Sequence, residues 1–190
     1  PEIPYTDYVA AEHTAFAVMT ALIHRARTGR GQFVDVSQSE TATSTIPEAL
    51  MDYTINGRTR DRVGNQDTAM SPHGCYRCLG DDKWIAIAVG TDEQWRSLCG
   101  VLDNPFWSKD SRFADALSRW QHREDLDGLL GDSTRERDQY ELMNALQGAG
   151  VPAGAVLNGK QLLHDPHLRS RGFYETVAHH PSTGIPPLPY

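Results

Sequence analysis

The sequence has few cysteines and no excess of basic residues. Its 190 residues contain three cysteines, and 18 lysines and arginines stand against 25 aspartates and glutamates, for a formal net charge of −7. The odd cysteine count argues against a disulfide framework and favours a reducing, cytoplasmic compartment. The negative charge argues against a nucleic-acid partner. No apolar run approaches the length of a membrane span and no signal-peptide pattern is visible, so we expect no membrane partner.

Several common catalytic and binding motifs are also missing. The sequence has no G-x-S-x-G elbow, no Walker loop and no G-x-G-x-x-G turn, although residue count alone leaves a Ser/His/Asp triad open. His73, Cys75 and Cys78 are side chains of the kind that bind zinc, but no second pair with ligand spacing completes four ligands. We therefore expect no metal. Cys99 lies among apolar residues of a predicted helix, which indicates a core residue rather than a nucleophile.

The stretch that begins at Asp7 carries the strongest local signals. An alanine-rich run with larger apolar residues extends to Ile23, and its apolar positions cover nearly the whole circumference of a helix. Such a helix is typical of a buried position inside a larger body. Arg25 and Arg27 followed by Gly29 are the residues expected at a helix C-terminus.

A short strand and a second helix are predicted after this first helix. Residues 33–36 are aromatic and β-branched, which favours a strand. Ser37 and Glu40 have the spacing of a capping box, which predicts a helix over residues 38–53. Pro47 lies inside that range and predicts a kink or a division into two helices.

Asp7 is the candidate functional residue of this stretch. It lies where the first helix begins, so unpaired backbone N–H groups and the positive end of the helix dipole surround its carboxylate. On local chemistry alone, Asp7 or Thr6 is better explained as an N-cap than as a catalytic group.

Residues 70–178 have the alternating pattern of an α+β unit. The predicted elements are a hairpin of strands at 75–79 and 84–89, a helix capped by Thr91, a loop at 104–107, helices over 119–130 and 137–149, an extended segment at 151–156, a short helix at 160–163 and a last strand at 171–177. The four tryptophans are predicted to be core or domain-contact residues.

The order and spacing of several motifs resemble the family III CoA-transferases. The segments concerned are Asp7 with Thr-Gly-Arg-Gly-Gln at 28–32, Gly-Asn at 64–65, and residues 72–78, 80–89, 150–154, 165–168 and 171–173. Together they cover nearly the whole chain, in the order found in the family.

The resemblance implies an α/β fold from an interlocked homodimer, and we expect the chain to be a piece of a longer protein. Residues 1–57 are then the C-terminal piece of a large Rossmann-like α/β domain, and 58–69 form a linker. Residues 70–178 form a smaller α+β domain, and 179–190 a return linker. Arg58, Arg60 and Arg62 in the linker either contact CoA phosphates or belong to a solvated connection, and both explanations stay open.

The resemblance also implies a reaction and its residues. Asp7 is the nucleophile that accepts the acyl group and then CoA, so that CoA passes from an acyl-CoA thioester to a small carboxylic acid through an aspartyl-CoA intermediate. Gln38 lies where the family places a contact to CoA, which is a substrate rather than a tightly bound cofactor. Two alternatives remain: a 2-methylacyl-CoA racemase of the same family, and a non-catalytic paralogue or partner subunit in which Asp7 is only a cap.

Overall fold

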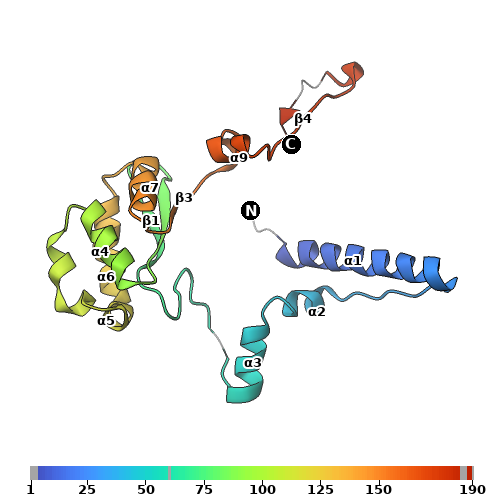
Figure 1. Ribbon diagram of the computed structural model, residues 1–190, viewed down its shortest axis with the longest axis horizontal. Coiled ribbons are helices and arrows are strands. Elements are labelled where there is room, and N and C mark those ends of the chain that lie inside the picture. The colour runs from blue at the N-terminus through green and yellow to red at the C-terminus, as the bar shows by residue number, and fades with distance from the viewer. Residues whose placement is uncertain (1–3, 60, 185–187, 190) are drawn as a thin grey trace. The chain divides into compact units, whose positions relative to one another are not determined.

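The computed structural model describes residues 4–59, 61–184 and 188–189. The chain divides into two compact units, Pro1–Arg62 and Val63–Tyr190, and each is described by itself (Figure 1). This division lies inside the segment predicted as a linker; the limits predicted for the domains remain predictions.

Unit 1 consists of three helices in its described residues. Helix α1 (Tyr5–Thr28) ends at Gly29, which has a φ of +72° and donates its N–H to Arg25, as the C-terminal signal predicts. Helix α2 (Gln38–Thr43) begins after Ser37, whose side chain accepts from the Glu40 N–H. Helix α3 (Pro47–Asn56) has its proline in the first turn, so the range predicted as one helix is divided into two.

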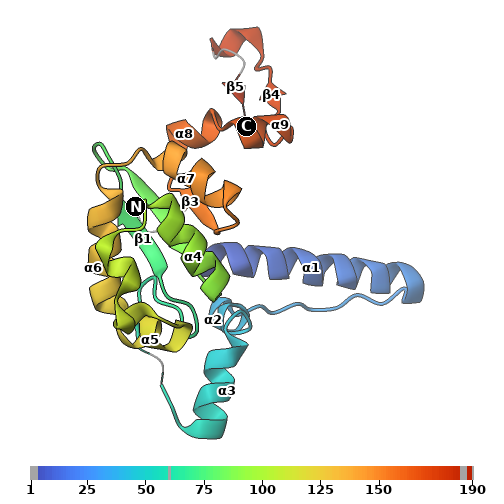
Figure 2. The same ribbon diagram turned by 60° about the vertical axis from the view of Figure 1, so that its left-hand side comes forward.

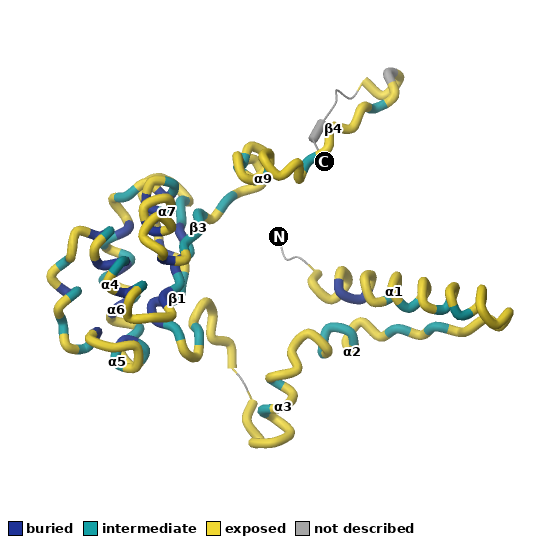
Figure 3. The backbone as a smooth tube through the Cα atoms, in the orientation of Figure 1, coloured by how far each residue is buried: buried dark blue, intermediate teal, exposed yellow. Residues whose placement is uncertain are grey.

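One prediction for unit 1 is wrong, and another stays a prediction. Residues 33–36 form no strand, because a strand needs a neighbouring strand for its hydrogen bonds and the described residues of unit 1 contain none. Helix α1 is largely exposed within unit 1 (Figure 3). Its buried residues are Val9 and Ala10, whereas Phe16 is 76% exposed. Its burial inside a larger body therefore stays a prediction. A helix needs a second layer of structure to bury such a surface, and unit 1 alone does not supply it.

Unit 2 is built on a three-stranded antiparallel sheet in the order β1-β2-β3. Strands β1 (His73–Arg77) and β2 (Trp84–Ala88) form the predicted hairpin, with Cys75 opposite Ala86, and β3 (Ala153–Ala155) pairs with β2. Alternation along a strand sends Ile85 and Ile87 to the same face, where both are buried.

The helices of unit 2 supply the rest of its core (Figure 2). The helices and 3₁₀ turns are α4 (Asp92–Val101), η1 (Phe106–Lys109), η2 (Ser111–Phe113), α5 (Ala116–Gln121), α6 (Arg123–Thr134) and α7 (Gln139–Gly148). Helix α4 has its predicted cap, since Thr91 accepts from the Gln94 N–H. The loop predicted at 104–107 is partly a 3₁₀ turn, and His122 separates the helix predicted over 119–130 into two.

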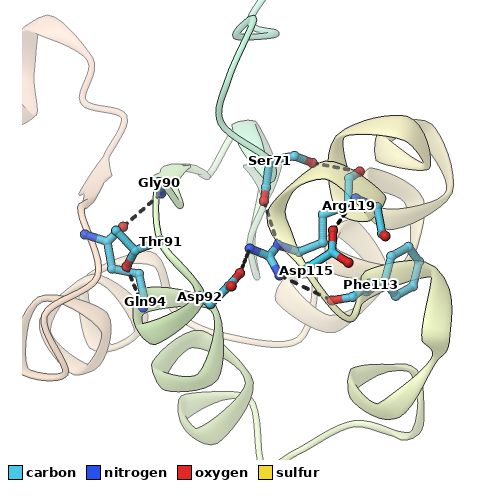
Figure 4. Close-up of polar contacts among 9 residues, drawn as sticks. Ser71, Gly90, Thr91, Asp92, Gln94, Phe113, Asp115 and Arg119 are labelled. Atoms are coloured by element: carbon cyan, nitrogen blue, oxygen red, sulfur yellow. Dashed lines mark hydrogen bonds and ion pairs between the residues drawn. The ribbon is translucent and has the colours of Figure 1, made fainter.

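The segment that leads into β1 is held by a buried arginine (Figure 4). The Arg119 guanidinium donates to the carbonyls of Ser71 and Phe113 at 3.2 and 3.3 Å, and to the Asp92 carboxylate at 2.6 Å. It also lies 5.0 Å from the centre of the Trp95 ring. Because the guanidinium of Arg119 is bonded to two carbonyls and paired with the Asp92 carboxylate, its charge is tolerated at a fully buried position.

The last part of unit 2 contains two short helices and a two-stranded pair. Helices α8 (Gly159–Leu163) and α9 (Pro166–Ser170) are capped by Asn158 and Asp165. Strand β4 (Thr176–Val177) pairs with β5 (Leu188–Pro189). The strand predicted over 171–177 is therefore too long, because Gly172 adopts a φ of +62° and turns the chain after α9.

Candidate active site

Asp7 lies in the first turn of α1, with its side chain exposed to solvent. The N-cap of this helix is Pro4, and no side chain caps it, so the explanation of Asp7 or Thr6 as an N-cap is wrong. The backbone N–H of Asp7 donates to Pro4 at 3.0 Å. An acidic residue in this turn is stabilised by the helix dipole, and its carboxylate stays available to a ligand.

The structure brings Gln38 to Asp7, which are 31 positions apart. The Gln38 Nε2 donates to the Asp7 Oδ1 at 3.0 Å. Both residues lie in first turns, Asp7 in α1 and Gln38 in α2, and these two helices pack against each other. The two residues singled out in the sequence are therefore direct hydrogen-bond partners, and the contact of Gln38 with CoA stays a prediction.

The basic cluster near the end of unit 1 is only partly described. Arg58 forms an ion pair with Asp52 at 3.2 Å, and Arg62 is exposed. Arg60 lies outside the described residues. Because the Arg58 side chain is 69% exposed, this ion pair contributes little to stability.

Unit 2 has a cleft of about 510 Å³ beside the β1 strand, lined by His73, Cys75, Arg77 and Asp127 among others. The buried Tyr76 hydroxyl donates to Asp127 at 2.6 Å. Burial, with a smaller contribution from Asp127, raises the pKa of Tyr76 far above its usual value. Burial also raises the pKa of Asp127, and the bond from Tyr76 partly offsets this.

The cysteines differ in their surroundings. Cys75 is exposed, whereas Cys78 and Cys99 are buried and none of the three is in a disulfide. Burial raises the pKa of the Cys99 thiol to about 11 and also that of Cys78. In the described part of the chain, no three histidine, cysteine or acidic side chains cluster closely enough to hold a metal ion. Nor does any helix there have the length and apolar character that a membrane crossing requires.

Three polar contacts were not predicted from the sequence: Gln38 with Asp7, Tyr76 with Asp127, and Arg119 with the Ser71 and Phe113 carbonyls and Asp92. Each includes residues far apart in the chain. For the contact of Gln38 with Asp7, the sequence offered one signal: residues 29–37, when extended, are nearly as long as the helix that they follow.

A sequence model of the CoA-transferase family III matches residues 1–188. The chain belongs to this family. It is 27% identical over 184 residues to the succinate–glutarate CoA-transferase of Agrobacterium fabrum, covering 97% of this chain and 46% of that protein. It is 30% identical over 165 residues to the succinyl-CoA–D-citramalate CoA-transferase of Chloroflexus aurantiacus, covering 87% of this chain and 41% of that protein.

A solved structure of the family supports the fold. The crystal structure of a CAIB/BAIF family protein from Brucella suis is 29% identical and superimposes with a TM-score of 0.83 over 93% of this chain and 47% of that protein. The family III chain described here thus spans less than half the length of each of these relatives.

Proposed function

We propose that the protein transfers CoA from an acyl-CoA thioester to a carboxylic acid, with Asp7 as the nucleophile. The observation that carries this proposal is the exposed Asp7 carboxylate in the first turn of α1, one oxygen of which accepts a hydrogen bond from the Gln38 side-chain amide. Family membership supports the same reaction. A carboxylate nucleophile suits CoA transfer because it forms an anhydride and a thioester of comparable reactivity to the substrate.

The reaction follows from this nucleophile in balanced steps. One Asp7 oxygen attacks the donor thioester carbonyl and expels CoA thiolate, which leaves a mixed anhydride on Asp7. The thiolate then attacks the Asp7 carbonyl carbon and expels the donor acid as its carboxylate, which leaves aspartyl-CoA. The acceptor carboxylate reverses both steps, so the products are acceptor acyl-CoA and free Asp7. CoA enters in the donor thioester and leaves in the acceptor thioester, so it takes part as a piece of the substrates and not as a tightly bound cofactor.

The names of the relatives guide the choice of substrates. Relatives of this chain are named for succinate, glutarate, citramalate, mesaconate and malate, which are short dicarboxylic acids. We propose the same class for this protein, with succinyl-CoA as the first donor. The working assembly that we propose is an interlocked homodimer, in which the exposed apolar surface of α1 is covered.

The test is detection of the intermediate. The protein is incubated with succinyl-CoA and a panel of other acyl-CoA thioesters, quenched, digested and examined by mass spectrometry for CoA on the peptide that carries Asp7. We expect the adduct in the wild type, none in Asp7→Asn, and an unchanged amount in Asp35→Asn, a matched control in the same unit. Deuterium uptake at the α-carbon of a 2-methylacyl-CoA without any adduct would instead support a racemase. Silence in both assays would contradict an enzymatic role.

A further inference from the structure

The hydrogen bond between Gln38 and Asp7 distinguishes the two oxygens of the Asp7 carboxylate. The Gln38 Nε2 lies 3.0 Å from Oδ1. Among the described residues, Gln38 is the side chain that donates to the Asp7 carboxylate, and none of them donates to Oδ2. Because an ionised carboxylate only accepts, Gln38 must present its N–H₂ group and not its carbonyl oxygen.

This contact follows from how unit 1 is built. From Asp7 to Thr28, α1 rises by roughly 32 Å at about 1.5 Å per residue. Residues 29–37 return alongside α1 (Figure 1), and nine residues can span at most about 30 Å when extended. The return therefore ends close to the start of α1, and Gln38 is the first residue of the helix that follows. Residues 33–36 are thus a spacer that fixes where Gln38 lies.

We infer that Gln38 is a positioning residue for Asp7, holding Oδ1 so that Oδ2 is the attacking oxygen. The inference rests on the proposed function. When CoA thiolate adds to the Asp7 carbonyl carbon in the anhydride, negative charge develops on Oδ1, the oxygen to which Gln38 already donates. The amide is then in place to stabilise that charge, and Oδ2 leaves with the donor acid. This role goes beyond the contact to CoA that the resemblance implies for Gln38.

The inference is tested by the rate of adduct formation with succinyl-CoA in a rapid-quench experiment. Loss of one side-chain donor to a developing oxyanion costs about 100- to 1,000-fold in buried active sites, so at this exposed position we expect Gln38→Ala to be about 10- to 100-fold slower. The Michaelis constant for succinyl-CoA should change little, because the ground-state carboxylate is solvated. Gln121→Ala, an exposed glutamine of unit 2 outside the 29–37 return, should match the wild type.

A second variant separates positioning from a structural role. In Gln38→Glu, the introduced carboxyl can donate to Oδ1 only while it is protonated. We compare the rate of adduct formation in each variant with the wild-type rate at the same pH. This relative rate for Gln38→Glu should fall towards that of Gln38→Ala as the pH rises. A purely structural role would give no such pH dependence. Wild-type rates in both variants, or a loss confined to the Michaelis constant, would overturn the inference and leave the proposed function standing. A wild type that forms no adduct would overturn the proposed function and this inference with it.

Discussion

Replacement of Arg119 by alanine is expected to destabilise unit 2 strongly. Its side chain is 1% exposed and donates to two backbone carbonyls and one carboxylate. Alanine leaves the Ser71 and Phe113 carbonyls without these donors, opens a cavity beside Trp95 and removes the contact of the cation with that ring.

The magnitude follows from these partners. Each buried carbonyl that loses its donor costs about 1–3 kcal/mol. The lost cation–π contact adds about 1 kcal/mol. Since water refills part of the space, we expect Arg119→Ala to lower the free energy of unfolding by about 4 kcal/mol. The matched variant Asp92→Asn should cost at most about 1 kcal/mol, because the Asp92 side chain is 52% exposed and the amide still accepts from Arg119.

Urea unfolding measures both variants. The four tryptophans of the chain lie between Trp84 and Trp120, so their fluorescence follows unit 2 alone. Because Arg119 touches Trp95, circular dichroism at 222 nm serves as the second probe. If Arg119→Ala and Asp92→Asn lowered the free energy of unfolding equally, the stabilisation would come from the ion pair and not from the hydrogen bonds to the two carbonyls. A loss below about 1 kcal/mol in Arg119→Ala would refute the reasoning altogether.

Two further predictions concern ionisable groups in unit 2. The raised pKa of Asp127 means that its contribution to stability is complete below the usual aspartate pKa of 3.8 and is lost as the pH rises through the value in the folded protein. Asp127→Asn should therefore gain stability relative to the wild type over that pH range in urea titrations, and a constant difference at all pH values would contradict this. Cys75 alone should react with a thiol reagent in the folded protein, while Cys78 and Cys99 react only after unfolding, as counted by absorbance or mass. Labelling of more than one thiol before unfolding would disprove the assigned burial.

The local signals of the sequence predicted much of the secondary structure. Gly29, Ser37, Pro47 and Thr91 each determine a helix end through bonds or steric limits within a few residues, so their effects do not depend on the rest of the fold. The β1–β2 hairpin was predictable for the same reason, because its two strands are adjacent in sequence.

The contacts between residues distant in the sequence were decided by the tertiary structure alone. Residues 33–36 have the aromatic and β-branched pattern that predicts a strand, but they form none. A strand needs a partner strand, and no local pattern supplies that partner. The burial of Arg119 could not be predicted either, since an arginine in a short polar segment is usually exposed and its partners lie as far as 48 positions away.

The sequence by itself determined that Asp7 lies near the start of a long helix and that a capped helix begins at Gln38. It did not determine that the two side chains meet. That contact depends on the path of residues 29–37 back along α1, which is a property of the folded chain. Local hydrogen bonds fix the ends of the helices, whereas the packing of α2 on α1 fixes the distance between the amide and the carboxylate on which the proposed chemistry depends.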